Sequence, residues 1–452
     1  MIARSGQEPC RLSLFQQIMA QWEEVEPYNA AHVVRLRGRI NAASLREAIQ
    51  TACQVAGVGA FVLDREKNCY RYAPTDGIEL REIEASHSAE EILHRTITEE
   101  MNTPFPETPG HPLRWMVLDD PRSDSHFLAA VWRHLPADDV AIRLLIRRVL
   151  NRYCGTPFAG DQSPLRVLAP DYARVMRHHF RRLGYLRTLQ RETQRYFRLR
   201  HVHRMRELPG ESHGSHFCVI QAPQGLIGRL ARACLARRVT VNDAFLAALG
   251  AAIAAITPDR NHHPRRRGLA LGTAVNVRPE ASVDLSNCFG LYLGHWVTIL
   301  EEPDLGDFEQ LLARIAEQTQ REKTEKRAVG PHWNFWAVAR LRRWGGLKDT
   351  RAWYRKVYPI SAVLSNVKLN AAWFRGAGER VLDYIRISPT GPALPLVLAT
   401  ARLGDRLNLT LGYHTSVLTD PEARNLTALF LARLELVAGG GLGASVGRAQ
   451  GR

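Results

Sequence analysis

Long apolar runs are scarce in this 452-residue sequence. No stretch approaches the roughly 18 consecutive apolar residues that a membrane span requires, and the richest run, residues 245–256, fits a buried helix better. The first residues carry Arg4, Glu8 and Arg11 without an unbroken apolar stretch, so we expect neither a secretory signal nor a mitochondrial-type leader. We therefore predict a globular protein that does not span a membrane, while peripheral contact with a membrane surface stays an alternative.

The cysteine pattern argues against two further classes of protein. The seven cysteines are odd in number, scattered along the chain and never spaced as Cys-x-x-Cys. Such a pattern speaks against both a disulfide framework and a zinc site. A reduced cytoplasmic compartment is the simplest expectation. The cysteines are Cys10, Cys53, Cys69, Cys154, Cys218, Cys234 and Cys288.

Positive charge is in surplus. The chain has 61 Lys and Arg residues against 45 Asp and Glu, a formal net charge of +16. A surplus of this size attracts an anionic partner. Nucleic acid, an acidic carrier protein, the phosphates of coenzyme A and anionic lipid all qualify, and charge alone does not choose among them.

Hydrophobic periodicity predicts alternating strands and helices, in a chain long enough for about two or three domains. In the first half we expect strands at 32–40, 113–118 and 126–134, with helices at 43–55 and from Asp138 or Asp139 to Gly155. In the second half we expect strands at 217–220, 269–277, 291–300, 360–367 and 407–413, with helices at 241–256, 308–321 and 421–436. This alternation is consistent with two similar α/β halves.

An arginine-rich segment, residues 171–207, lies between these halves. It is helical in character and predicts a crossover between domains. A partial apolar stripe indicates a connector packed along one lobe rather than an arm for nucleic acid. The glycine-rich tail, residues 439–452, is expected to be disordered. The stripe consists of Phe180, Leu183, Leu186, Leu189 and Phe197.

The most informative stretch is residues 127–139, where an apolar strand runs into His134 and then into a helix. Asp138 follows four residues later and gives an HxxxD arrangement. The sheet holds a histidine at a strand end while its neutral ring, with a pKa near 6.5, can accept a proton at physiological pH. Asp138 can cap the helix or pair with a cation.

At this motif the chain resembles the superfamily of condensation domains and coenzyme A-dependent acyltransferases, whose signature is HHxxxDG. Its other motifs are most similar to bacterial wax ester synthase/diacylglycerol acyltransferases and to stand-alone condensation proteins. They keep the family's order and span almost the whole chain. They are Pro27-Tyr28-Asn29 with Leu36-Arg37-Gly38, His111-Pro112-Leu113-Arg114-Trp115, Thr240-Val241-Asn242-Asp243-Ala244, Ala274-Val275-Asn276-Val277-Arg278-Pro279, Asn287-Cys288-Phe289-Gly290 and Leu364-Ser365-Asn366-Val367.

The resemblance implies an α/β (α+β) fold with two chloramphenicol acetyltransferase-like lobes and a substrate tunnel at their junction. The lobes would be residues 1–170, which carry the HxxxD motif, and 208–438. His134 would act as the general base that moves an acyl group from acyl-CoA or an acyl-carrier protein to a small-molecule alcohol or amine. Asp138 would be mainly structural, with Arg278 as its partner. Neither a metal nor a cofactor besides the thioester substrate is needed.

Two alternatives stay open within the same fold. One is a stand-alone condensation enzyme that joins carrier-bound substrates into an amide or ester. The other is an inactive binding member, because Arg133 replaces the first histidine of the signature and Asp139 replaces its glycine. Glycine lets a substrate backbone or pantetheine arm come close. Asp139 would therefore narrow the tunnel or favour an unusual acceptor.

The other candidate residues have both a structural and a functional interpretation. Asn242 and Asp243 stand at a helix start, where a Thr-x-x-Asp pattern also forms a capping arrangement. Ser365 and Asn366 fit strand-end hydrogen bonding or a place near the developing oxyanion. The histidine pairs lack carboxylate or cysteine company, so we expect solvated residues rather than metal ligands. These pairs are His178-His179, His201 with His203, and His262-His263.

A late segment, residues 333–355, mixes tryptophan with arginine. Core packing, an acyl-tunnel wall and interfacial membrane contact all fit it. Aromatic residues amid arginine can also stack on single-stranded nucleic acid, but no recognised nucleic-acid motif accompanies them, so we expect no nucleic-acid partner. Its aromatic residues are Trp333, Phe335, Trp336, Trp344 and Trp353.

Overall fold

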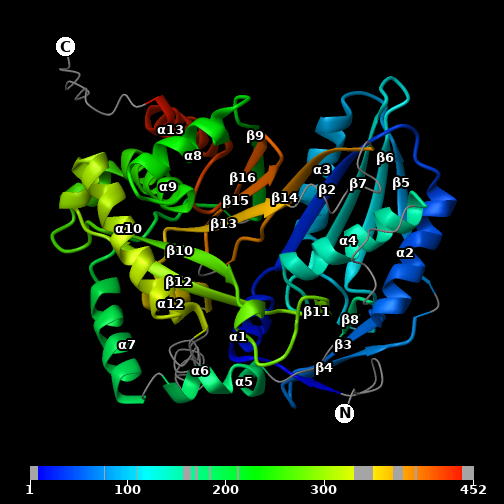
Figure 1. The fold of residues 1–452 in the computed structure, drawn as a ribbon, viewed down its shortest axis with the longest axis horizontal. Coiled ribbons are helices and arrows are strands. Elements are labelled where there is room, and N and C mark those ends of the chain that lie inside the picture. Colours follow the sequence, from blue (N-terminus) through cyan, green and yellow to red (C-terminus); the bar gives the residue numbers. More distant parts are fainter. Residues whose placement is uncertain are drawn as a thin grey trace.

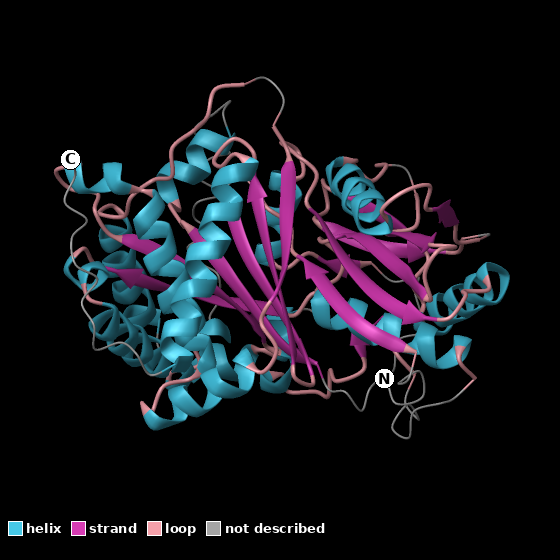
Figure 2. Cartoon of the chain, turned by 90° about the horizontal axis from the view of Figure 1, so that it is seen from above, coloured by secondary structure: helices cyan, strands magenta, loops and turns pink. Residues whose placement is uncertain are grey.

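The computed structural model describes most of the chain and contains two large β-sheets (Figure 1). Figure 2 shows the sheets side by side, with helices packed around them. The α/β fold class is as predicted. The described residues are 9–75, 77–107, 109–155, 164–167, 172–182, 185–210, 213–329, 350–369, 380–391 and 394–439.

The first sheet is buried on both faces. Along its central strand β7, Phe127, Ala129 and Val131 pack toward helix α3 (Ala89–Asn102), whereas the alternate side chains pack toward α2 (Ala42–Ala56) and α4 (Asp139–Tyr153). Side chains of a strand alternate between faces, so burial on both sides explains a nearly continuous apolar run. The sheet has the order β14 (Val381–Ile387), β2 (Asn29–Arg37), β7 (Ser125–Arg133), β6 (Leu113–Asp119) and β5 (Leu80–Glu84).

The second sheet has one face covered by helices α8 (Leu226–Ala236), α9 (Val241–Ile256), α10 (Phe308–Thr324) and α13 (Asp420–Gly439). α9 is apolar nearly all round, as expected of a helix enclosed by neighbours. The sheet has the order β12 (Leu293–Leu300), β10 (Leu269–Asn276), β13 (Ala362–Leu369), β15 (Leu396–Leu403), β16 (Arg406–His414) and β9 (Ser215–Gln221).

One strand of the first sheet comes from the second half of the chain. β14 comes from the range expected for the C-terminal lobe, yet it pairs antiparallel with β2 and completes the first sheet. The smaller elements are β1 (Cys10–Arg11), α1 (Leu14–Trp22), β3 (Ala60–Asp64), β4 (Cys69–Ala73), β8 (Arg166–Val167), β11 (Cys288–Phe289) and α12 (Thr350–Val357). The described residues also include the 3-10 helices η1 (Pro258–His262), η2 (Arg278–Glu280), η3 (Pro303–Gly306) and η4 (Arg327–Val329).

Most predicted elements are present within a few residues, and the helix at 241–256 matches α9 at both ends. The arginine-rich segment differs from the prediction. Its described residues form the separate helices α5 (Tyr172–Val175), α6 (Arg177–Arg182) and α7 (Tyr185–Leu199), and residues 200–207 are not helical. Phe197 is 54% exposed, so it does not extend a buried stripe. The other four stripe side chains, the tail 440–452 and the aromatic residues at 333–344 lie outside the described parts, whereas Trp353 packs against the core.

No single helix in the described part of the chain has the length and apolarity of a membrane span. α8 and α9 reach that criterion only as a pair, and they meet at a bend of 102°.

One buried ion pair joins the two halves at the turn after β7. Asp138, the N-cap of α4, accepts from Arg278 Nη1 at 2.7 Å and from Arg278 Nη2 at 2.9 Å. Both side chains are nearly inaccessible to solvent. Arg278 follows β10 of the second sheet, so the pair fixes this turn against the opposite half. This is the partner that the resemblance led us to expect.

We predict that Asp138→Ala and Arg278→Ala each lower the free energy of unfolding by about 3–5 kcal/mol, because each leaves a buried charge without its partner. The double variant should lose less free energy of unfolding than the sum of the two single losses, because the second change removes the charge that the first leaves unpaired. Urea unfolding curves measure these values. The exposed pair Arg46–Glu82 serves as the control, for which we expect about 1 kcal/mol or less. Additive losses at Asp138 and Arg278 would contradict the coupling.

Candidate active site

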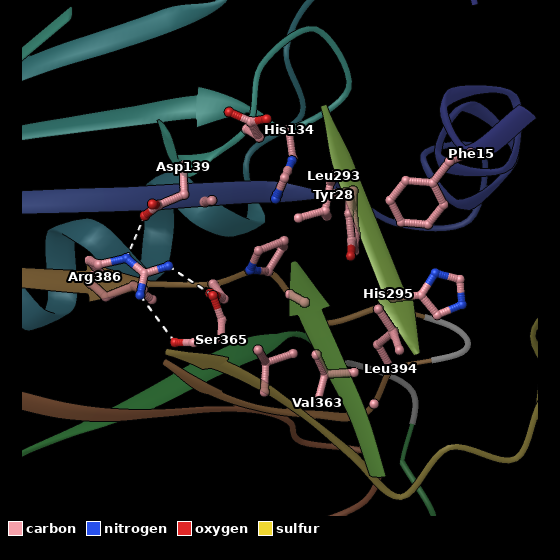
Figure 3. Close-up of a pocket in the computed structure, with 18 of the residues that line it drawn as sticks. Phe15, Tyr28, His134, Asp139, Leu293, His295, Val363, Ser365, Arg386 and Leu394 are labelled. Carbon is pink, nitrogen blue, oxygen red and sulfur yellow. Dashed lines mark hydrogen bonds and ion pairs between the residues drawn. The ribbon is translucent and has the colours of Figure 1, made fainter. Parts of the chain in front are cut away.

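A cavity of about 100 Å³ lies between the two halves, with walls from both sheets and from α1 (Figure 3). Its lining is mostly apolar and aromatic. Such a lining excludes water and strengthens the electrostatic interactions of the polar groups that face it. The apolar and aromatic residues include Phe15, Trp22, Tyr28, Trp132, Leu293, Ile360 and Val363.

His134 is the residue directly after β7, and its ring extends into this cavity (Figure 3). Its backbone N–H donates to the Tyr28 carbonyl at 3.1 Å, and its ring stacks on the Tyr28 ring at 5.6 Å between centroids. The Trp132 indole N–H donates to the Ala137 carbonyl at 3.0 Å and so braces the turn. Sheet, ring stacking and turn together fix where the imidazole lies.

Burial lowers the pKa of His134 below its ordinary value of 6.5. The carbonyls of His134 and Ala137 and the charges of Asp138 and Asp139 oppose the shift without reversing it. The imidazole is therefore neutral at pH 7 and can accept a proton.

The Asp138 carboxylate is fully engaged. It accepts four hydrogen bonds: two from Arg278, one from the Ala141 N–H at 3.0 Å and one from the Tyr292 N–H at 2.8 Å. A buried carboxylate with this many donors is held in one position. Its place therefore supports a structural role rather than proton transfer.

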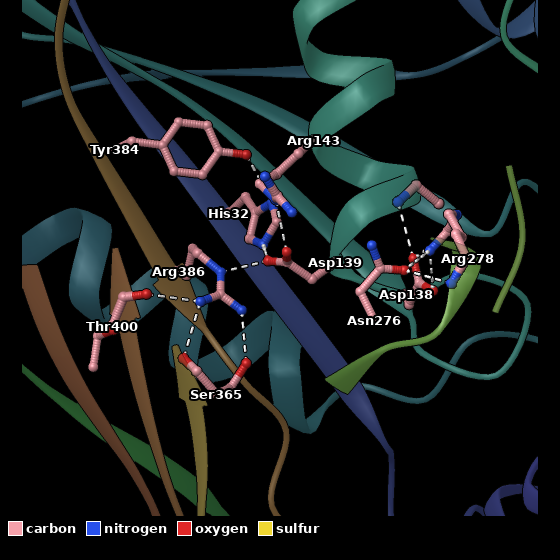
Figure 4. Close-up of polar contacts among 11 residues, drawn as sticks. His32, Asp138, Asp139, Arg143, Asn276, Arg278, Ser365, Tyr384, Arg386 and Thr400 are labelled. Atoms are coloured by element: carbon pink, nitrogen blue, oxygen red, sulfur yellow. Dashed lines mark hydrogen bonds and ion pairs between the residues drawn. The ribbon is translucent and has the colours of Figure 1, made fainter. Parts of the chain in front are cut away.

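Asp139 also lines the cavity and belongs to a second charged network (Figure 4). It accepts from His32 Nε2 at 2.8 Å and from Arg143 Nε at 2.7 Å, and it pairs with Arg386. Burial alone would raise the pKa of Asp139, but Arg386, Arg143 and the hydrogen bond from His32 hold it well below its ordinary value. The carboxylate that replaces glycine is thus ionised and neutralised by its neighbours.

Arg386, on β14, connects this network to the second sheet. It donates to the Ser365 carbonyl at 3.1 Å, to the Ser365 hydroxyl at 2.8 Å and to the Thr400 carbonyl at 2.8 Å. His32 Nδ1 accepts from the Tyr384 hydroxyl at 2.9 Å, which leaves the His32 proton on Nε2, facing Asp139. Sequence reasoning missed both Arg386 and His32. The only signal was a titratable side chain at a buried position of a strand, and β14 and β2 each carry further polar residues, so the pattern singled out neither residue.

The other departure from the signature, Arg133, does not line the cavity. Its guanidinium forms a bidentate pair with Glu23, with contacts of 2.6–3.0 Å, and lies over the Phe61 ring at 5.2 Å. Both charged side chains are about 8% exposed. Arg133 therefore anchors α1 to the first sheet and leaves the His134 ring unobstructed.

The remaining candidates separate into two groups. Ser365 lines the cavity, whereas the Asn366 side chain accepts from the Thr400 hydroxyl at 2.5 Å and is not part of the lining. Asn242 and Asp243 are not part of it either. Asp243 completes a capping box with Thr240 and accepts from the Thr319 hydroxyl at 2.6 Å. The capping interpretation therefore accounts for Asp243. Its position outside the cavity lining gives no support to the functional interpretation.

Sequence reasoning also missed a third histidine in the cavity. His295 Nε2 lies 2.9 Å from the Tyr358 hydroxyl, and its ring stacks on Phe15. The prediction that the paired histidines are solvated is wrong for His179 and His203, which are both buried, and His179 contacts the Glu280 carbonyl at 2.9 Å. In the described part of the chain, no three His, Cys, Asp or Glu side chains gather as a metal site.

His32 provides a test of the charged network. Burial lowers its pKa from 6.5 to about 4, so the unfolded chain binds its proton at higher pH than the folded protein does. Stability must therefore fall as pH drops through this window. In the wild type, the free energy of unfolding should fall between pH 7 and pH 4.5. We predict that this fall is smaller by roughly 2–3 kcal/mol in His32→Gln. Denaturant unfolding at both pH values measures it, with the exposed His262→Gln as control. An unchanged pH dependence in His32→Gln would contradict the assignment.

Comparisons with known proteins bear on this geometry. No curated protein matches the sequence. Among solved structures, the first condensation domain of the CDA synthetase is 16% identical, covers 97% of this chain and 98% of its own, and has a TM-score of 0.68. The trichothecene 15-O-acetyltransferase TRI3 from Fusarium sporotrichioides is 13% identical over 95% and 94% of the chains, with a TM-score of 0.70.

A third similar structure is the starter condensation domain of rhizomide synthetase, in complex with C8-CoA and Leu-SNAC. It is 15% identical over 95% of this chain and 94% of its own, with a TM-score of 0.62. The fold of these proteins has two lobes, as here. The family model "Condensation domain" matches residues 7–329. This chain therefore belongs to the condensation-domain family.

Proposed function

We propose that this protein is an acyltransferase that moves an acyl group from a thioester to a hydroxyl or amine, with His134 as general base. One observation carries the proposal: a neutral, desolvated imidazole at a strand end extends into an apolar cavity between two lobes. A base of this kind needs to be neutral at working pH and within reach of the proton that it removes.

In the proposed reaction, His134 accepts the proton of the acceptor O–H or N–H while the acceptor atom attacks the thioester carbonyl. The tetrahedral intermediate then collapses, its C–S bond breaks, and the protonated ring gives its proton to the leaving thiolate. A donor near the developing oxyanion lowers the barrier. Ser365 suits this role, because its oxygen accepts from Arg386 while its own O–H stays available to donate.

The family and the similar structures support a class of donor. A coenzyme A thioester and a carrier-bound thioester share the pantetheine arm, and the rhizomide synthetase domain is described with both C8-CoA and a short thioester analogue. We propose that this chain uses a pantetheine thioester as substrate and a small-molecule alcohol or amine as acceptor. The reaction needs no further cofactor.

A non-catalytic binding module is the second candidate, because Arg133 and Asp139 depart from the signature. Both residues, however, have ion-pair partners of their own, and His134 still lines the cavity. These compensating contacts favour a working site over a degraded one.

We predict that His134→Ala folds and binds donor but loses about 10²–10⁴-fold in turnover, because only the proton acceptor is removed. Thiol release from acyl-CoA and from acyl-carrier protein, across a panel of alcohols and amines, measures turnover. Thermal melting within a few degrees of the wild type serves as the folding control. Wild-type turnover in His134→Ala would eliminate the proposed base. Donor binding without thiol release by the unmodified protein, with every donor and acceptor, would favour the binding module.

A further inference from the structure

A second, smaller pocket adjoins the main cavity. The two share Tyr358 and Ile360 as lining residues, so these side chains form a common wall. The Tyr358 hydroxyl contacts His295 Nε2 on the cavity side at 2.9 Å. A flexible arm bound in the small pocket would need to pass only this wall to reach the cavity of His134.

The small pocket is lined by two arginines from distant parts of the chain. Arg204 lies in the non-helical stretch after α7, and Arg355 lies near the end of α12. Arg355 is ion-paired with Glu207, which is itself about half exposed. Arg204 has no carboxylate partner among the described residues, and its Nη2 donates to the Lys356 carbonyl at 3.1 Å.

Arg204 also carries a donor that the fold leaves unused. Its Nε atom is buried without a hydrogen-bond partner in the described part of the chain. Buried polar groups are nearly always paired, so this donor is open to an acceptor that the described part of the chain does not supply. Burial, with the nearby charges of Arg266 and Arg355, lowers the pKa of Arg204. An anion placed here would relieve the repulsion and accept the unused hydrogen bond.

The geometry points to a phosphate subsite. The planar guanidinium fork matches phosphate oxygens, and hydrogen bonds between charged groups are the strongest that a protein forms. We propose that Arg204 and Arg355 bind the phosphate of the pantetheine arm of the substrate, whose thioester end then extends past Tyr358 toward His134. This inference rests on the proposed function and adds to it an entrance and an anchoring residue.

Calorimetric titration with pantetheine, 4′-phosphopantetheine and coenzyme A tests the subsite without any turnover. We expect 4′-phosphopantetheine to bind at least about tenfold more tightly than pantetheine, as one charge-assisted contact implies. Arg204→Ala should remove most of that gain, whereas Arg46→Ala, which deletes an exposed arginine of α2, should retain it. The gain should also shrink at high salt.

Equal affinity for pantetheine and 4′-phosphopantetheine, or a gain that survives in Arg204→Ala, would overturn the subsite. A gain in affinity that appears only with coenzyme A would assign the pocket to the nucleotide end of coenzyme A. That result would also overturn the proposal that the pocket binds the phosphate of the pantetheine arm. Thermal melting of Arg204→Ala and Arg204→Lys checks folding, and partial recovery of the gain in Arg204→Lys is expected because the charge is kept.

Turnover separates this proposal from the proposed function. An acyl-N-acetylcysteamine thioester carries no phosphate, so thiol release from it depends on His134 without the subsite. We expect the ratio of kcat/KM for acyl-CoA to kcat/KM for acyl-N-acetylcysteamine to fall about tenfold in Arg204→Ala. An unchanged ratio would contradict the subsite, while absence of thiol release from both donors in the wild type would contradict the proposed acyltransferase.

Discussion

The Asp138 carboxylate is shared by the two halves of the molecule. It caps α4, receives the Tyr292 N–H and both terminal nitrogens of Arg278, and it does so out of contact with water. Burying two charges is costly unless geometry and hydrogen bonding are nearly complete. The Asp138–Arg278 pair meets both conditions, so it fixes the position of the groups around it. The place of the His134 turn, the approach of the lobes and the cavity between them all depend on it.

A second charged network lets the chain depart from the family signature without disrupting the site. Asp139 would be an unpaired charge in an apolar cavity, but two arginines and the neutral His32 surround it. Arg133 is similarly satisfied by Glu23. The crossover of β14 makes this possible, because it brings Arg386 from the second half of the chain to the first sheet. Positive charge is thus used twice inside the protein: to hold the lobes together and to neutralise a wall of the cavity.

Local patterns predicted what local interactions decide. The 3.6-residue spacing and caps gave α2, α4 and α9, and the apolar strand into HxxxD placed His134 at the end of β7. The partners of Asp139 could not be predicted, since His32 and Arg386 meet it only through tertiary pairing of β2, β7 and β14. For Asp243, a local pattern was enough to explain the residue. The capping box at the start of α9 accounts for its position, and the functional role considered for it is not needed. Phe197 lies in a helix but stays exposed, because helical spacing does not say whether a partner surface exists.

We propose that the His134 ring is held neutral in the cavity, where it accepts the proton of the acceptor. The most direct measurement is an NMR titration of the histidine rings in the folded protein, with the His134 signals assigned by their loss in His134→Gln. We predict a His134 ring that is neutral at pH 7 and protonates only below pH 6.5, because burial disfavours its charged form. A His134 ring that is already cationic at pH 7 would contradict the claim, because it would have no lone pair left to accept the acceptor's proton.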